Sequence, residues 1–236
     1  MSDEHYCEDL VRRRDETRWL SARYAPDPAR ARLIALYAFH QELIQIPGAV
    51  SEPPLGEIRL QWWREALAEA MAGGNVRAHP VAQMLAATGL VTEASRSLLE
   101  AAIDARAHLL YKEGFSDARA YEAWADRAEG YLAAVRRLED ADAESGETAL
   151  LVRAEAIFGH LARPNLLSEP FRAADEETAA TLAEALRPIF AAMAPERAAA
   201  HAHLCLLGKK ALTAPGPFSG VSQRLRLFKA MATGNL

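Results

Sequence analysis

The segment from residue 30 to residue 46 constrains the fold more than any other part of the chain. Its apolar side chains leave almost no polar face: they are Leu33, Ile34, Leu36, Tyr37, Phe39, Leu43, Ile44 and Ile46. A helix that is apolar nearly all round belongs in the middle of a bundle rather than on its surface. Four polar residues interrupt the run and need hydrogen-bond partners if they are buried, namely His40, Gln41, Glu42 and Gln45. The segment is therefore either the wall of a ligand site or a core helix whose few polar groups are satisfied.

Helical periodicity continues on both sides of this segment. Residues 9–24 predict one amphipathic helix, and residues 58–71 predict another that Gly73 ends. Further helices are expected over residues 80–85, 92–110, 121–138, 150–161, 178–193, 195–212 and 221–232. Pro188 predicts a kink or a break in its helix, and the acidic run 139–147 predicts a loop. Because no stretch alternates as a strand does, we expect one all-α domain, a helical bundle over residues 1–236.

Composition excludes some classes of function. The net charge of −5 argues against a protein that binds nucleic acid by broad phosphate neutralisation. Two cysteines without a CxxC pattern indicate a reducing compartment. We find no basic and apolar leader, and no run of the ~20 apolar residues that a membrane span needs. The expected location is the cytoplasm, with peripheral contact at the inner membrane left open.

Two motifs around the central segment resemble the squalene/phytoene synthase family. They are RLIALYAF at residues 32–39 and, after a turn that contains two prolines, LQWWREAL at residues 60–67. Looser matches precede the central segment, cover residues 121–138 and recur near the C-terminus in the same order. The resemblance implies an all-α isoprenoid-synthase fold, a bundle around a deep central cavity. The candidates for lining that cavity or binding a ligand are Tyr37, His40, Gln41, Glu42, Ile44, Gln45, Arg59, Trp63 and Tyr131.

The same resemblance implies a metal site that this sequence lacks. Active members join two prenyl diphosphates head to head, and magnesium ions held by two Asp-rich motifs take up the diphosphate charge. The first motif is expected at residues 44–48, which read IQIPG. The second is expected at residues 154–170, where Glu155 and Glu169 are the only carboxylates and have the wrong spacing. We therefore expect no catalytic residue, no metal and no cofactor.

The pattern from Phe39 to Leu67 further resembles a non-catalytic branch of this family. That branch includes an assembly factor for mitochondrial respiratory complex I and its bacterial relatives. The resemblance implies an assembly or interaction factor whose partners are proteins, such as complex I subunits or assembly intermediates. Trp62 and Arg64 are the candidate partner-surface residues, because Trp and Arg are enriched at interfaces. Neighbouring helix positions point about 100° apart, so one of the two adjacent tryptophans should pack inside while the other lies nearer the surface.

Two other functions stay open. One is a prenyl-diphosphate transferase that needs magnesium and builds an atypical metal site from Glu42, Glu57 and Glu155. The other is a protein that binds an apolar isoprenoid or lipid in the central cavity.

Some polar residues have plain structural alternatives. Glu42 and Gln45 can hydrogen-bond Arg59 or Gln61 of the next helix instead of lining a cavity. His201 and His203 are two apart on an expected helix, face different ways and are not expected to share a zinc ion. The basic residues near the C-terminus form either a solvated face or a patch for anionic lipid or an acidic partner; they are Lys209, Lys210, Arg224, Arg226 and Lys229.

Overall fold

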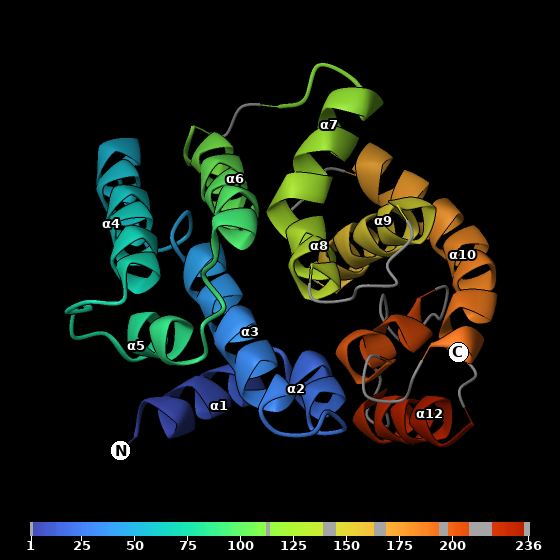
Figure 1. The fold of residues 1–236 in the computed structure, drawn as a ribbon. Helices are drawn as coiled ribbons and strands as arrows, with labels where there is room; N and C mark the ends of the chain where they lie inside the picture. Colours follow the sequence, from blue (N-terminus) through green and yellow to red (C-terminus); the bar gives the residue numbers. More distant parts are fainter. Residues whose placement is uncertain are drawn as a thin grey trace. The chain divides into compact units, whose positions relative to one another are not determined.

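The structure is a computed structural model that describes residues 2–111, 114–138, 145–162, 169–193, 198–207 and 219–233. Its regular elements are helices, and no strand occurs within these ranges, so the all-α prediction is confirmed (Figure 1). None of the helices in the described ranges is long and apolar enough to cross a membrane. The chain packs as two compact units, the first from residues 1–19 and 26–116, the second from residues 20–25 and 117–236. One domain over residues 1–236 stays a prediction.

The first unit is built on the central helix α3 (Ala29–Gln45). Every side chain from Leu33 to Gln41 is buried, and so is that of Leu43, which confirms the expectation of a core helix. The helices that pack against α3 are α1 (Asp3–Arg14), α5 (Pro80–Ala87) and α6 (Glu93–Leu110). The helix α4 (Pro53–Ala72) packs on α5 and α6, and Gly73 ends it in the left-handed conformation at φ 68°.

The prediction of a single helix over residues 9–24 is wrong. The chain leaves the helical conformation at Asp15, with φ −149° and ψ 69°, and α2 (Glu16–Ala22) begins at the next residue. The Asp15 carboxylate accepts a hydrogen bond from the backbone N–H of Arg18 at 3.1 Å. An aspartate in this position satisfies a donor that the first turn of a helix leaves without a partner, which favours a new helix start there.

The second unit contains most of the polar residues discussed below. Its elements are α7 (Ala118–Ala125), the π-helical turn η1 (Asp126–Gly130), α8 (Tyr131–Arg137), α9 (Ser145–Leu161), α10 (Glu169–Ala192), the 3-10 helix η2 (Ala199–Leu206) and α12 (Ser219–Thr233). The helix α9 packs against α8, η1 and α10, while α12 packs against η2. A core of α8, α9, α10, η2 and α12 side chains includes Phe158, Leu186, Leu204 and Leu227.

Three predictions from the sequence concern elements of the second unit. A kink or a break was predicted at Pro188; α10 continues through that residue, so the chain does not break there, and the neighbours Leu186, Ile189 and Phe190 lie in the core. The helix expected over residues 195–212 is reduced, among the described residues, to the short 3-10 helix η2. The acidic loop falls mostly on residues 139–144, outside the described ranges, and residues 145–147 form the first turn of α9.

Candidate functional site

An aromatic cluster occupies the middle of α4 in the first unit. Trp63 is 4% exposed and packs edge-on against Phe39, with ring centroids 5.3 Å apart. Trp62 is only partly buried and lies 4.9 Å from Trp63, while His79 lies 5.3 Å from each of the two rings. The prediction that one tryptophan packs inside and the other lies nearer the surface is therefore confirmed.

The outer tryptophan, Trp62, carries a stacked cation. The Arg77 guanidinium stacks over Trp62 at 4.6 Å from its centroid and pairs with Glu69 at 2.6 Å. Hydrogen bonds from Arg77 lower the pKa of Glu69 to about 2. Two residues beyond Trp62 on α4, Arg64 pairs with Asp104 at 2.6 Å. Trp62 and Arg64 are both partly buried, and their role as a partner surface stays a prediction.

The candidate residues of α3 face the interior of the first unit. Tyr37, His40 and Gln41 are buried, and Ile44 is partly buried. The Gln45 side chain donates to the carbonyl of Gln41 in its own helix at 3.0 Å. The predicted hydrogen bond from Gln45 to Arg59 or Gln61 is therefore wrong, because a helix offers a carbonyl one turn back without any change in the backbone.

Glu42 faces α1 rather than the next helix. Burial raises its pKa, and the charge of Arg14 opposes that rise. The charge of Glu42 in turn contributes to the raised pKa values of Tyr6 and Cys7 on α1, where burial is the larger cause. The alternative partners predicted for Glu42, Arg59 and Gln61, are not the groups that set its environment.

Two further cavity candidates belong to other helices. Arg59 is exposed on α4, and Tyr131 is buried at the start of α8 in the second unit. Cavity lining by the nine candidate residues stays a prediction.

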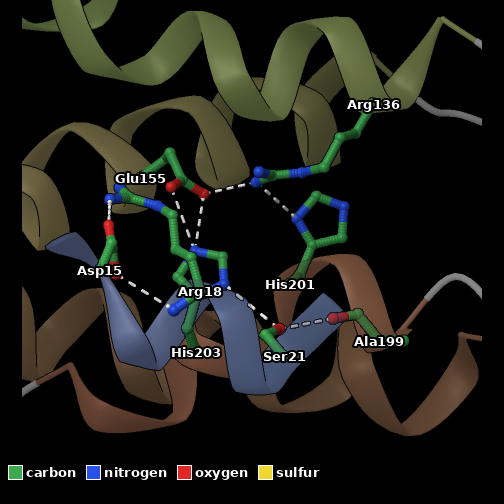
Figure 2. A network of polar contacts seen from close by, with 8 residues as sticks. All are labelled: Asp15, Arg18, Ser21, Arg136, Glu155, Ala199, His201 and His203. Atoms are coloured by element: carbon green, nitrogen blue, oxygen red, sulfur yellow. Dashed lines mark hydrogen bonds and ion pairs between the residues drawn. The ribbon is translucent and has the colours of Figure 1, made fainter. Parts of the chain in front are cut away.

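The second unit holds a buried ion pair that the sequence does not reveal. Glu155 on α9 is fully buried and pairs with Arg136 of α8, whose side chain is 4% exposed (Figure 2). His203 of η2 donates from its Nε2 to the same carboxylate, 3.1 and 3.0 Å from its two oxygens. The other ring nitrogen of His203 lies 3.4 Å from Oγ of Ser21, which donates to the Ala199 carbonyl at 2.5 Å. Glu155 is therefore a structural anchor for three elements.

His201 contacts the same network from the opposite side. Arg136 donates from Nη2 to its Nδ1 at 3.2 Å (Figure 2). Complete burial lowers the pKa of His201 well below its usual value, and the charge of Arg136 adds to this effect. The two histidines therefore have different roles, since neutral His201 accepts from Arg136 while His203 donates to Glu155. They share a polar network.

A second buried network joins α7, α9 and α10. The hydroxyl of Tyr121 donates to Oδ2 of Asp175, and Nδ1 of His160 lies 2.7 Å from that hydroxyl. The His160 ring stacks on Trp124 at 5.4 Å and an interplanar angle of 8°. Burial and the Asp175 carboxylate raise the pKa of Tyr121 well above its usual value. The phenol thus remains protonated and serves as a donor between two helices.

Sequence reasoning missed most members of the two networks. The available signal was a charged or polar residue inside an otherwise apolar helical stripe, as at Arg136, Glu155 and His160. Such a residue is buried only if a partner exists, and its partner lies on a different element. The pattern of one helix indicates that a partner is needed but does not identify it.

The family model for squalene/phytoene synthase matches residues 11–147, more than half of the chain. The chain belongs to the squalene/phytoene synthase family. Comparison with solved structures finds no match.

Within the squalene/phytoene synthase family, the chain is similar to curated proteins named NADH dehydrogenase (ubiquinone) complex I, assembly factor 6. It is 38% identical to the human protein over 64 residues, 27% of this chain and 19% of that protein. It is 32% identical to the rat protein over 131 residues, 55% of this chain and 39% of that protein. It is 31% identical to the mouse protein over 127 residues, 54% of this chain and 38% of that protein. The matches thus cover less than half of each relative.

The described residues do not fit the magnesium–diphosphate site that this synthase family implies. Residues 44–48, the place of the first motif, carry no carboxylate. Glu155, at the place of the second, is occupied by Arg136 and His203. Glu57 accepts from the hydroxyl of Tyr111 at 3.2 Å. Among the described residues, no three His, Cys, Asp or Glu side chains gather as a metal would require. The alternative site of Glu42, Glu57 and Glu155 stays a prediction.

Proposed function

We propose that this chain is a non-catalytic assembly factor for respiratory complex I. The observation that carries the proposal is the use of Glu155. In the place where a synthase needs a magnesium ligand, this carboxylate accepts hydrogen bonds from Arg136 and His203 inside the protein. We take the partners of the protein to be complex I subunits or assembly intermediates. We place the protein in the cytoplasm, in peripheral contact with the inner membrane.

Electrostatics explains why such a carboxylate is a poor metal ligand. Magnesium requires carboxylate oxygens in near-octahedral geometry and keeps several of its waters. Recruiting Glu155 would leave Arg136 as a buried cation without its counter-charge, and breaking a buried pair in this way costs about 3–5 kcal/mol. Without metal, the ionisation of a prenyl diphosphate loses the electrostatic stabilisation that is usually the largest catalytic contribution.

The names of the relatives support the choice of partner. Those relatives are named as assembly factors of complex I, and they resemble this chain over up to 55% of its length. An assembly factor needs a surface for another protein, and Trp62 and Arg64 provide aromatic and guanidinium groups of the kind enriched in such surfaces.

The direct test is a deletion strain of the organism that carries the gene, grown with oxygen. We expect lower NADH:quinone oxidoreductase activity in its membranes, accumulation of partial complex I on native gels, and recovery of complex I subunits with the tagged chain. Normal complex I in the deletion strain, with none of its subunits recovered, would overturn the proposal.

A matched pair of variants tests the surface itself. Arg64 pairs with Asp104 and Arg30 pairs with Asp27, both at 2.6 Å, and the two arginines are 30% and 31% exposed. If Arg64 contacts the partner, Arg64→Ala should lower subunit recovery about tenfold, the weight of one interface arginine. Arg30→Ala should leave recovery unchanged. Equal effects of the two substitutions would show that Arg64 is not part of the partner-binding surface.

Enzyme activity is tested separately with purified protein. Incubation with farnesyl or geranylgeranyl diphosphate and magnesium should yield no head-to-head product. Product that forms with the unaltered chain and disappears with Glu42→Gln would establish a transferase instead. Co-purification of an apolar isoprenoid, without any effect on complex I, would favour the lipid-binding alternative.

A further inference from the structure

The last described helix, α12 (Ser219–Thr233), presents two different faces. Leu227 and Ala230 are buried in the core of the second unit, where α12 packs against η2. On the opposite side Leu225 is 64% exposed and Phe228 is 61% exposed. These two side chains are three residues apart, so they lie next to each other on one face of the helix.

Cations border this apolar stripe on both sides. With about 100° per residue, Arg224 and Lys229 fall on opposite sides of the stripe formed by Leu225 and Phe228, while Arg226 falls farther round the helix, toward the buried Ala230. All three cations are exposed. The helix contains no aspartate or glutamate, and neither does η2, on which it packs. A positively charged apolar face therefore stands out on a chain whose net charge is −5.

We infer that the Leu225–Phe228 face of α12 docks on the surface of an anionic lipid membrane. A helix lying in the interfacial plane buries apolar side chains at the boundary between headgroups and acyl chains. Lysine and arginine at its borders extend to the lipid phosphates, which keeps their charges in the headgroup region while their stems cover apolar surface. The apolar stripe of α12, with cations on both sides, matches what such an interfacial helix requires.

Charge favours a membrane over a protein groove as the occupant. A groove for an amphipathic helix takes its apolar face, but α12 already buries one apolar face in its own unit. Among the described side chains, Leu225 and Phe228 are the large apolar groups that remain outside. So narrow a face would on its own hold a protein partner weakly. An extended anionic surface adds attraction to every bordering cation at once, each worth about fivefold in binding near the surface.

Vesicle sedimentation with the purified full chain tests this inference. The probes are vesicles of phosphatidylcholine alone and vesicles of phosphatidylcholine and phosphatidylglycerol in equal parts. We expect binding to the anionic vesicles and little to the neutral ones. Arg224→Gln with Lys229→Gln should weaken anionic binding about 25-fold, because each of the two bordering cations contributes about fivefold. Leu225→Ser with Phe228→Ser should weaken it at least about tenfold, because the apolar contact is lost.

A matched control uses exposed apolar residues of the first unit. Leu55 and Ile58 on α4 are 48% and 66% exposed and also lie three residues apart. Leu55→Ser with Ile58→Ser should leave vesicle binding unchanged, and far-UV circular dichroism checks that each variant is folded. Absence of binding to anionic vesicles, or equal loss with the α4 and α12 substitutions, would overturn the inference. So would α12-dependent binding to an acidic protein without binding to anionic vesicles.

The inference rests on the membrane contact in the proposed function, but the two experiments can fail separately. Vesicle binding uses the purified chain alone, so it can succeed where complex I assembly fails to depend on the protein, and the reverse.

Discussion

The substitution Glu155→Gln puts the buried network to a quantitative test. The side chain of Glu155 is 0% exposed and that of its partner Arg136 is 4% exposed. Glutamine keeps the shape of glutamate but removes the charge, so the buried Arg136 loses the counter-charge that Glu155 supplies. Removing one partner of a buried pair costs about 3–5 kcal/mol. Because a domain is stable by only about 5–15 kcal/mol in total, the loss should be a large fraction of the unfolding free energy.

Urea unfolding followed by far-UV circular dichroism measures this loss. Since the chain packs as two units, amide hydrogen exchange should locate the destabilisation in the second unit, first in α9. A second variant supplies an internal check: Arg136→Met added to Glu155→Gln should recover part of the loss, because no uncompensated charge then remains.

An exposed ion pair serves as the control. Glu184 pairs with Arg187 at 2.8 Å, and their side chains are 67% and 51% exposed. Exposed pairs contribute at most about 1 kcal/mol, so Glu184→Gln should change stability little. If Glu155→Gln destabilises the protein no more than Glu184→Gln does, Glu155 is not the anchor that its contacts indicate.

Three further predictions follow from other parts of the structure. A Cβ added at Gly130 would lie 2.7 Å from the carbonyl oxygen of Val152, so Gly130→Ala should cost about 1–3 kcal/mol in urea unfolding, whereas Gly74→Ala, with open space around it, should cost less. Burial lowers the pKa of His201, so below pH ~6.5 the unfolded chain binds a proton at this residue that the folded chain does not bind. The free energy of unfolding should therefore fall with decreasing pH by up to about 1.4 kcal/mol per pH unit. His201→Gln should flatten that slope, and an unchanged slope would contradict the assignment. Burial and the charges of nearby carboxylates raise the pKa of Cys7 to about 12, so at mildly alkaline pH a thiol reagent should label it in the urea-unfolded chain and not in the folded one, and fast labelling of the folded chain would show that it is accessible.

Local patterns in the sequence accounted for much of the fold. The central helix was predictable because its side chains are apolar in every direction, and burial depends mainly on that property. The positions of Trp62 and Trp63 followed from helix geometry alone, since one must turn inward when the next turns outward. The split at Asp15 was missed because the apolar periodicity continues through it, while a side-chain cap at that residue favours a new start.

For the candidate site too, part was predictable from the sequence and part was not. The absence of carboxylates at residues 44–48 is a property of the sequence itself, and it already argued against a synthase metal site. Only the tertiary structure decided what Glu155 does, because its partners Arg136 and His203 are 19 and 48 residues away in the chain. Periodicity reports which face of a helix is buried, but a hydrogen bond between elements depends on how those elements pack. For this protein, the sequence determined which groups were missing and which helix was buried, and packing determined how the buried charges of different helices were paired.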